Sequence, residues 1–398
     1  MPRLAGPEAR PQASLPQYDI VKVAVVHDWL VAYGGGERAL KHILRCFPGA
    51  DLFVPVDFLA EQDRDILNGS RVHTSFIQRM PAARTRYWDY LPLMPIAMEQ
   101  FDLTGFDVVI SNSHSVAKGV IVHPEQVHAS YVLSPMRYAW DLQASYLRDF
   151  GLTSGVRSIA ARVMLHRLRK WDVSTSARVD AMAAPSRYIA RRIELAYRRP
   201  ASILPPPVDV DFFTPADDSR EPFYLAASRL IPFKRMDAIV DAFAAMPTRS
   251  LVVIGDGPDL VRLRRRASRN VRLLGFQPDE MLRSYMRRAR AFVFAAPEDF
   301  GIVMVEAQAC GTPVIALGRG GALDIVRGLE TSEPTGVFFS EPTPAGVRAG
   351  IEAFEQEGNR IAAEHCRQNA LRFSATLFEE RFRAFIAETV EHFRPDRR

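Results

Sequence analysis

Two glutamates separated by seven residues are the most informative feature of the sequence. They lie in PEDFGIVMVEAQACGTPVIALGRGG (297–321), where Glu298 follows an apolar run and Gly301 is expected to open a helix that carries Glu306. The first backbone N–H groups of a helix lack partners within it and bind anions. We therefore expect a diphosphate to sit on the amides of Phe300, Gly301, Ile302 and Val303. The carboxylates can then accept hydrogen bonds from sugar and ribose hydroxyls; the alternative is a solvated Glu298 and a Glu306 that only caps.

A pair of cations follows another predicted strand end. In SRLIPFKR (228–235), Arg229 and Lys234 are five positions apart in a loop, so both can reach one diphosphate. Arginine offers a bidentate fork and lysine a point charge. Such a pair often lies on the surface without a binding role. Here it follows a strand of the same predicted sheet as the strand before Glu298, which favours phosphate binding.

A glycine run and a histidine occupy the first half of the chain. Gly34, Gly35 and Gly36 can let a loop approach a phosphate or sugar closely, or can simply form a flexible turn. The run lacks the G-K-[ST] of a P-loop, so nucleoside-triphosphate hydrolysis is not expected. His114 comes directly after the buried run DVVI (107–110) and its short polar continuation, where either a structural or a catalytic role is open.

The composition describes an ordinary globular protein with a mild basic excess. The 398 residues are 47% hydrophobic, and the formal net charge of +5 is too small to indicate nucleic-acid binding by itself. Cys46, Cys310 and Cys366 fit neither a zinc site nor a disulfide framework. Asp209–Asp211 (DVD) resembles a metal-binding D-x-D but lies in a proline-rich segment, so we assign no metal. No apolar run is long enough to cross a membrane.

Apolar runs alternate with helical stretches along the chain, which indicates an α/β fold with parallel sheets. The predicted strands are 21–26, 107–110, 128–133, 181–184, 223–226, 250–254, 271–274, 291–295 and 313–316. Three consecutive prolines within residues 203–215 predict a linker between two Rossmann-like domains, 19–202 and 216–375. Residues 1–18 are expected to be a disordered extension, and 376–398 an amphipathic helix with a capping box at Thr376 and Glu379.

These residues carry a family resemblance. The second half of the chain resembles the retaining glycosyltransferases of family 4, whose signature E-x-F-G-x-x-x-x-E is matched from Glu298 to Glu306. The Arg and Lys pair of that family matches Arg229 and Lys234, and its strand followed by G-x-G matches VVIGDGP (252–258). The resemblance implies a GT-B fold: two domains, a cleft between them, and a C-terminal helix that returns to the N-terminal domain.

Three strings in the first half narrow the resemblance. HDWLVAYGGGERAL (27–40), SNSHSVAKGV (111–120) and SPMRYAWD (134–141) are similar to the O-antigen mannosyltransferase subfamily. This implies transfer of a hexose, with GDP-mannose as the favoured donor, to a polyprenyl-diphosphate-linked saccharide in polysaccharide biosynthesis. No cofactor or metal is implied, since the nucleotide-sugar is a substrate. The scattered cysteines indicate a reducing compartment, so we expect a cytoplasmic location, with peripheral contact to the inner face of the cell membrane left open.

The resemblance also implies a role for each candidate residue. Arg229, Lys234 and the helix amides would hold the phosphates, Glu306 the ribose and Glu298 the donor sugar, while the base would pack near Phe276 and Gln277. His114 stands where the family has a histidine facing the reacting sugar. From their residue types, Tyr138 and Trp140, beside Arg137, could line the acceptor entrance, although such aromatics more often pack.

Other classes of protein share parts of this pattern. A nicotinamide-dependent dehydrogenase needs G-x-G-x-x-G, but Leu260 stands at the third glycine position after Gly255 and Gly257. A non-catalytic sugar-nucleotide-binding protein and a GT-B sugar-nucleotide epimerase stay open as alternatives. The sequence does not identify the acceptor, the linkage, the pathway or the oligomeric state, and it does not decide between GDP and UDP.

A basic stretch suggests a further partner. Residues 151–200 hold eleven arginines and lysines against three acids, with Arg162, Arg169 and Lys170 at helical spacing. Together with the aromatic string RTRYWDYLPLMP (84–95), this stretch could dock on an anionic membrane surface. The alternative is a solvated basic face and a packed loop.

Overall fold

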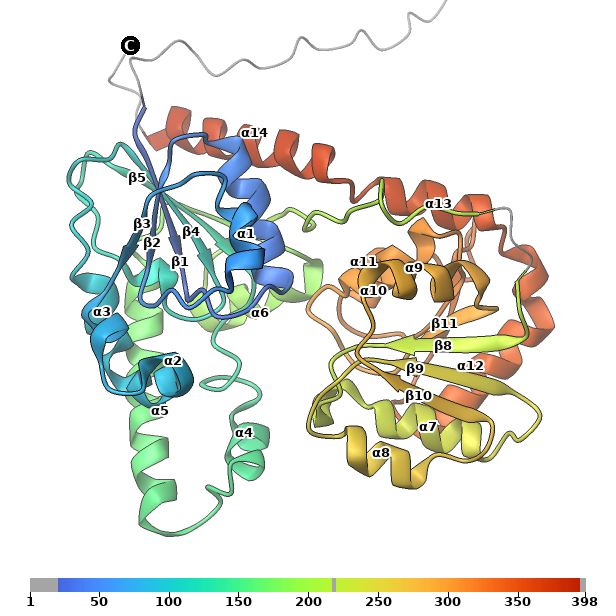
Figure 1. The fold of residues 1–398 in the computed structure, drawn as a ribbon. Helices are drawn as coiled ribbons and strands as arrows, with labels where there is room; N and C mark the ends of the chain where they lie inside the picture. Colours follow the sequence, from blue (N-terminus) through green and yellow to red (C-terminus); the bar gives the residue numbers. More distant parts are fainter. Residues whose placement is uncertain (1–20, 217–219, 394–398) are drawn as a thin grey trace, which may run out of the picture.

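The structure, a computed structural model, describes residues 21–216 and 220–393. It contains two parallel sheets in two domains, with helices on both faces of each sheet (Figure 1). The predicted extension at residues 1–18 and the last five residues of the predicted C-terminal helix segment lie outside the described residues.

The N-terminal domain is built on a seven-stranded sheet of order β3-β2-β1-β4-β5-β6-β7. The strands are β1 Val23–His27, β2 Asp51–Val54, β3 Val72–Thr74, β4 Val108–Ser113, β5 Val127–Val132, β6 Ala181–Ala184 and β7 Ser202–Ile203. The helices are α1 Gly35–Cys46, α2 Ala83–Arg86, α3 Met94–Glu99, α4 Gln143–Asp149, α5 Gly155–Ser176 and α6 Arg187–Tyr197. Because helices cover both faces, β4 and β5 are buried along their whole length.

The C-terminal domain repeats this plan with six strands in the order β10-β9-β8-β11-β12-β13. The strands are β8 Phe223–Ala227, β9 Ser250–Ile254, β10 Val271–Gly275, β11 Ala291–Phe294, β12 Val314–Leu317 and β13 Gly336–Phe339. The helices are α7 Met236–Ala244, α8 Leu260–Arg266, α9 Asp279–Arg288, α10 Ile302–Ala309, α11 Ala322–Ile325, α12 Pro344–Glu357 and α13 Ala363–Leu371. The strand order reverses between β1 and β4 and again between β8 and β11, and ligands bind at the carboxyl ends of strands at such points.

The predicted strands agree with the observed ones to within two or three residues at each end, and the prediction of a two-domain α/β fold is confirmed. Four strands were missed: β2, β3, β7 and β13. They contain between two and four residues each, and β7 is exposed along its length. Residues 204–215 join the two sheets without a helix or strand of their own apart from one bridge, Val208 to Ser374.

The last helix, α14 (Ala375–Phe393), leaves the C-terminal domain and crosses back to the N-terminal one (Figure 1). Its buried side chains Phe378, Phe382 and Ile386 complete the core formed by β1, β2, β5 and α1. The predicted return of this helix is therefore confirmed. The predicted capping box is wrong: the Ser374 hydroxyl accepts the Leu377 amide, and Glu379 instead contacts His42 Nδ1 at 2.8 Å.

Candidate active site

The carboxyl ends of β8 and β11 bring a cation and a carboxylate together. Lys234 lies in the turn that follows β8, and its ammonium donates to Glu298, which follows β11. Both side chains are largely buried. The pairing joins residues 64 positions apart, and it places the predicted phosphate-binding lysine beside the predicted sugar-binding glutamate.

The helix that should seat a diphosphate begins one residue after the predicted opening. Gly301 is the N-cap of α10, and its φ of 107° is a backbone conformation that residues with a Cβ rarely adopt. Glycine is therefore required at this turn. A second glycine pair supports it, because added Cβ atoms at Gly320 and Gly321 would collide with the backbone of Glu298 and Phe300. These two glycines were not predicted to have a role, although they stand beside each other shortly after a strand.

Glu306 lies on the buried face of α10, and its partner comes from the other domain. The Arg38 guanidinium, on α1, donates to the Glu306 carboxylate and also lies 3.9 Å from Asp279. Burial raises the pKa of Glu306, and Arg38 only partly offsets this. Arg38 was missed as a site residue, since its pairing spans 268 positions of sequence.

Three other residues that were predicted to bind the sugar-nucleotide donor lie at the same edge of the sheet. Arg229 follows β8 and is exposed, while Phe276 and Gln277 follow β10. The Phe276 ring is 74% exposed, and the Gln277 amide donates to the Leu274 carbonyl. Their roles in binding stay predictions.

Across from these residues, a buried carboxylate orients His114. Asp28 follows β1 and is fully buried, and its oxygens accept the backbone N–H groups of His114, Ser115, Val116 and Ala117 at 2.5–3.0 Å. The His114 Nδ1 atom lies 2.8 Å from the same carboxylate. Burial alone would raise the pKa of Asp28, but His114, His27 and the hydrogen bonds hold it well below its ordinary range.

The contact with Asp28 leaves one nitrogen of the His114 ring for another partner. With Nδ1 engaged by Asp28, Nε2 is the nitrogen that can meet a sugar hydroxyl. Trp29 packs edge-on against this ring at 4.8 Å between centroids, and Trp88 packs on Trp29 at the same separation. Asp28 was not singled out from the sequence, although it follows His27 in the same string.

The glycine run lies at the N-terminus of α1 and faces α10. A Cβ on Gly35 would be 3.5 Å from the Ile302 side chain, so the loop and the expected diphosphate seat are neighbours. The Glu37 carboxylate accepts the Gly34 amide at 3.0 Å, and the Asn112 side chain donates to the Gly36 carbonyl at 3.0 Å. These hydrogen bonds fix the loop, so the structure does not support the alternative of a flexible turn.

Behind this loop, His27 and Glu37 form a buried pair, with His27 Nε2 3.4 Å from Glu37 Oε1. Burial lowers the pKa of His27, but Glu37 and Asp28 outweigh it, so the pKa is raised above 6.5. Burial raises the pKa of Glu37, and His27 outweighs it, so that pKa falls below 4.5. Both groups are consequently charged between these two values.

We predict that Glu37→Gln destabilises the protein in a pH-dependent manner. The stabilisation from a raised histidine pKa is complete below the unfolded value and is lost as pH rises through the folded pKa. The loss in free energy of unfolding should be about 1–3 kcal/mol near pH 6 and should shrink as the pH rises above 6.5. Urea denaturation of both proteins on either side of that value measures it. If the difference in free energy of unfolding stayed constant over this range, Glu37 would not stabilise the protonated form of His27.

Several polar contacts hold the two domains together around the Glu298 loop. Asp299 accepts hydrogen bonds from both Arg137 and Arg192, and its carbonyl accepts the Ser186 hydroxyl. Arg187 pairs with Asp324 nearby. The suggestion that Tyr138 and Trp140 line the acceptor entrance is not supported, because Tyr138 is buried against Ser115 and the Trp140 indole donates to Asp172. Their neighbour Arg137 is engaged at the interface with Asp299.

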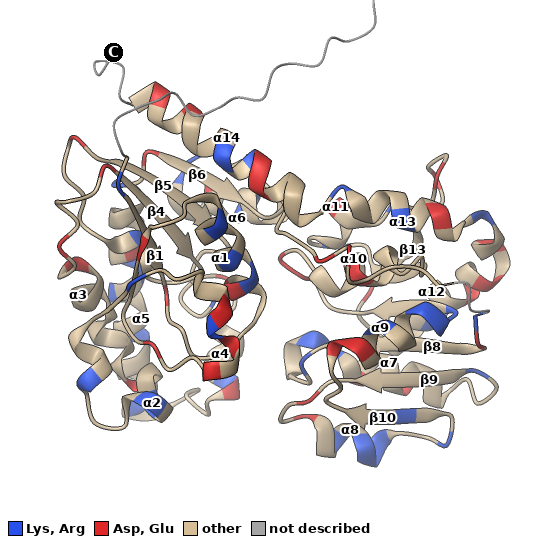
Figure 2. Cartoon of the chain, turned by 45° about the horizontal axis from the view of Figure 1, so that its top comes forward, with Lys and Arg blue, Asp and Glu red and all other residues tan. Residues whose placement is uncertain are grey.

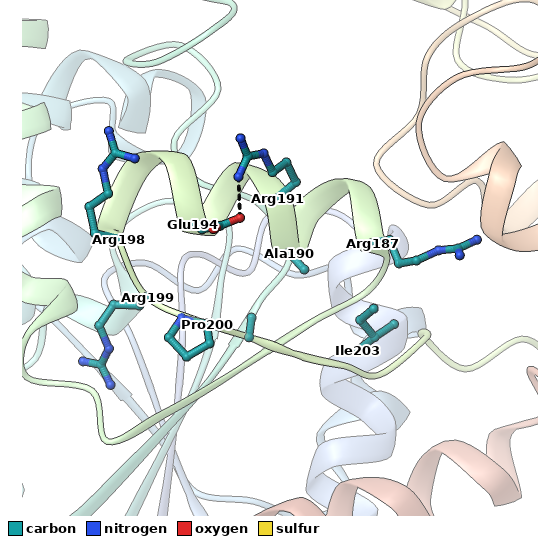
Figure 3. Close-up of a pocket in the computed structure, with 9 residues that line it drawn as sticks. Arg187, Ala190, Arg191, Glu194, Arg198, Arg199, Pro200 and Ile203 are labelled. Atoms are coloured by element: carbon teal, nitrogen blue, oxygen red, sulfur yellow. Dashed lines mark hydrogen bonds and ion pairs between the residues drawn. The ribbon is translucent and has the colours of Figure 1, made fainter.

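Two hollows lie near the domain boundary. One, of about 180 Å³, is lined by both domains and the connecting segment, and includes Tyr33, Arg38, Asp209 and Asp279. Asp209 caps the Phe212 amide at 2.9 Å, and among the described residues no group of three metal-ligating side chains could hold a metal ion. The other, of about 560 Å³, lies beside α6. Figure 3 shows that its Arg187, Arg198 and Arg199 side chains point in different directions, so they offer no converging seat for a diphosphate.

Comparisons with known proteins identify the second half of the chain. A family model for glycosyl transferases group 1 matches residues 208–373. The GDP-mannose-dependent alpha-(1-6)-phosphatidylinositol monomannoside mannosyltransferase of Mycolicibacterium smegmatis is 32% identical over 214 residues, 44% of this chain and 55% of that protein. The D-inositol 3-phosphate glycosyltransferase of Xylanimonas cellulosilytica is 34% identical over 217 residues, 46% of this chain and 51% of that protein. The chain thus spans about half the length of these curated relatives.

Solved structures extend the likeness to both domains. Anabaena Alr3699/HepE in complex with UDP and glucose aligns with a TM-score of 0.66 at 18% identity, over 92% of this chain and 100% of that one. Sucrose-phosphate synthase from Thermosynechococcus elongatus aligns with a TM-score of 0.69 at 15% identity, over 93% and 100%. At these identities the likeness concerns the fold, and it confirms the predicted GT-B architecture. The chain therefore carries a glycosyl transferases group 1 domain as the second half of a two-domain GT-B fold, as its resemblance to the family 4 glycosyltransferases implied.

Proposed function

We propose that the protein is a retaining glycosyltransferase that transfers a hexose, mannose from GDP-mannose, to a polyprenyl-diphosphate-linked or similar saccharide in polysaccharide biosynthesis. The observation that carries this proposal is the contact between the predicted diphosphate site of the C-terminal domain and the glycine loop of the N-terminal domain. Lys234 pairs with Glu298 at the edge of the C-terminal sheet, and the following helix α10 begins against the glycine loop of the other domain, where Gly35 approaches Ile302. The Mycolicibacterium relative, whose name specifies GDP-mannose and a phosphatidylinositol mannoside, supports the donor and a lipid-linked acceptor.

In this proposal the C-terminal domain binds the donor. Glu306 binds the ribose, Glu298 the donor sugar, and Arg229, Lys234 and the α10 amides the diphosphate. When the bond between the sugar anomeric carbon and the phosphate oxygen breaks, both electrons stay on the diphosphate. Fixed cations and amides stabilise that charge without reorganising, which is usually the largest catalytic contribution.

The acceptor hydroxyl attacks the anomeric carbon on the face that the leaving group occupied, so the configuration is retained. Its proton passes to an oxygen of the departing diphosphate, which leaves as GDP. His114 lies on the acceptor side, where Nε2 can hydrogen-bond a hydroxyl of the reacting sugar. Since Lys234, Arg229 and the amides supply the positive charge, we propose that no cofactor or metal is needed and that activity persists in excess EDTA.

The donor is tested by binding. GDP and GDP-mannose should raise the melting temperature of the protein more than UDP, UDP-glucose or dTDP-glucose at equal concentration, because a ligand stabilises by mass action. Glu306→Gln is the matched variant, in which the shift should fall. A stronger effect of UDP would reject the mannosyltransferase assignment and leave the fold unaffected.

Catalysis is tested by adding acceptor to the donor complex. Release of GDP together with a glycosylated product distinguishes a transferase from a binding protein, which releases no nucleotide on adding acceptor. A C2-epimerised sugar, formed without an acceptor, would instead indicate an epimerase.

We also propose that the protein works at the inner face of the cell membrane, in the cytoplasm, where its lipid-linked acceptor would lie. Within the described residues, no helix is long and apolar enough to cross a membrane. Contact would then be peripheral, through the protein surface.

A further inference from the structure

A helical hairpin projects from the N-terminal domain. It consists of α4, the loop 150–154 and the 22-residue α5, and in Figure 1 it extends on the opposite side of the domain from α14. Its inner face is anchored, since Leu165 and Leu168 belong to the domain core. The Arg169 guanidinium fastens α4 to α5 by donating to the Ala139 carbonyl at 2.6 Å and to the Gln143 side chain.

The outer face of this hairpin is apolar where a solvated helix would be polar. Val156, Ile159 and Val163 are 83%, 64% and 46% exposed, and Phe150 in the loop is 72% exposed. The three α5 residues are spaced i, i+3 and i+7, so they form one stripe opposite the buried side. A contiguous apolar stripe on a protein surface marks a place where something else binds.

The charges around the stripe indicate what binds there. From Phe150 to Trp171 the chain has no acidic residue and five basic ones. Of these, Arg157, Arg162, Arg167 and Lys170 are exposed, and helical spacing places Arg167 and Lys170 on the same side as the apolar stripe. The predicted set of docking residues needs two corrections: Arg169 is engaged inside the hairpin, and Arg162 lies off the apolar stripe and donates to the Ser158 hydroxyl.

We propose that the α4–α5 hairpin docks the protein on an anionic lipid surface, with Phe150, Val156, Ile159 and Val163 entering the interface and Arg157, Arg167 and Lys170 contacting headgroup phosphates. A second copy of the chain fits less well, because it would bring the same positive charge against this face. Basic residues with long stems suit such a position, since their stems lie along apolar material while their charges reach the phosphates. The proposal deepens the proposed function, from which it takes the lipid-linked acceptor.

The test uses the full-length protein and sedimentation with two kinds of vesicle: pure phosphatidylcholine, and equal parts of phosphatidylcholine and phosphatidylglycerol. Wild-type protein should bind the mixed vesicles at least about tenfold more tightly than the neutral ones and should dissociate as salt rises. The apolar variant V156S/I159S/V163S and the charge variant R157Q/R167Q/K170Q should each lose about tenfold or more of this binding.

Matched controls lie on the other domain. V261S/M281S/L323S removes three exposed apolar side chains, and R265Q/R269Q/R272Q removes three exposed charges on and near α8, which is marked blue in Figure 2. Both controls should bind vesicles like the wild type. All four variants change exposed positions, so an unchanged melting temperature is expected and shows that loss of binding is not loss of fold.

Three results would overturn the proposal: equal wild-type binding to both kinds of vesicle, hairpin variants that bind like the controls, or a wild-type dimer in solution that the apolar variant dissociates. GDP-mannose binding and transfer to a soluble acceptor should be the same in all variants. Loss of vesicle binding with intact transfer therefore concerns the hairpin alone, whereas a wild type that binds vesicles but transfers no sugar rejects the proposed function alone.

Discussion

Lys234→Met should lower kcat for sugar transfer by about 10²–10³-fold, the effect of removing one preorganised partner of a developing oxyanion. The ammonium lies beside Glu298, at the side where α10 begins. As the sugar leaves, negative charge grows on the diphosphate, and a largely buried cation stabilises it more than a solvated one can. Binding of GDP should weaken less than catalysis, since the charge is greatest in the transition state.

The matched control is the neighbouring Arg235→Met. Arg235 is more exposed than Lys234 and contacts Asp237 at 3.4 Å, away from Glu298. Its kcat should stay within about twofold of the wild type, as expected for an exposed pair. If kcat in Lys234→Met changed no more than in this control, Lys234 would have no part in stabilising the leaving group.

Asp299→Ala should reduce the free energy of unfolding by about 2–5 kcal/mol, the cost of removing one partner from a buried, hydrogen-bonded charge group. The substitution removes the carboxylate partner of Arg137. It also removes one of the two carboxylate partners of Arg192. Because Asp299 adjoins Glu298, transfer activity should fall as well. Urea denaturation measures the first effect and steady-state kinetics the second.

The control for this variant is Asp324→Ala at the same interface. The Arg187 side chain is mostly exposed, so its ion pair contributes about 0–1 kcal/mol, and the Arg187 backbone N–H that Asp324 also accepts at 2.8 Å adds about 1 kcal/mol. Equal losses in the two variants would show that the interface depends on overall charge and not on the contacts of Asp299.

The candidate site could be predicted where its residues share one short string. Glu298, Gly301 and Glu306 fall on a strand end and the following helix, a local arrangement that spacing alone defines. Arg38 and Asp28 could not be found in this way, because their roles depend on contacts with Glu306 and His114, 268 and 86 positions away. No local pattern reports which distant side chain will face a residue after folding.

Some residues singled out from the sequence have a structural role different from the predicted one. Trp140 was a candidate for the acceptor entrance and Arg169 for the basic docking face, yet the Trp140 indole binds Asp172 and Arg169 holds the α4–α5 hairpin together. Thr376 and Glu379 have the spacing of a capping box, but the neighbouring Ser374 supplies the cap. Where several residues could fill one local role, tertiary contacts decide among them.

The path of α14 has a consequence for how the protein is made. The ribosome completes α1 and β5 long before it reaches Phe378, Phe382 and Ile386, which pack against them. Until then the first domain has an open apolar face, and nascent chains are expected to need a chaperone or to fold only on release. A chain stopped at residue 374 would keep that face permanently, so fragments from interrupted synthesis should aggregate even though both sheets are complete.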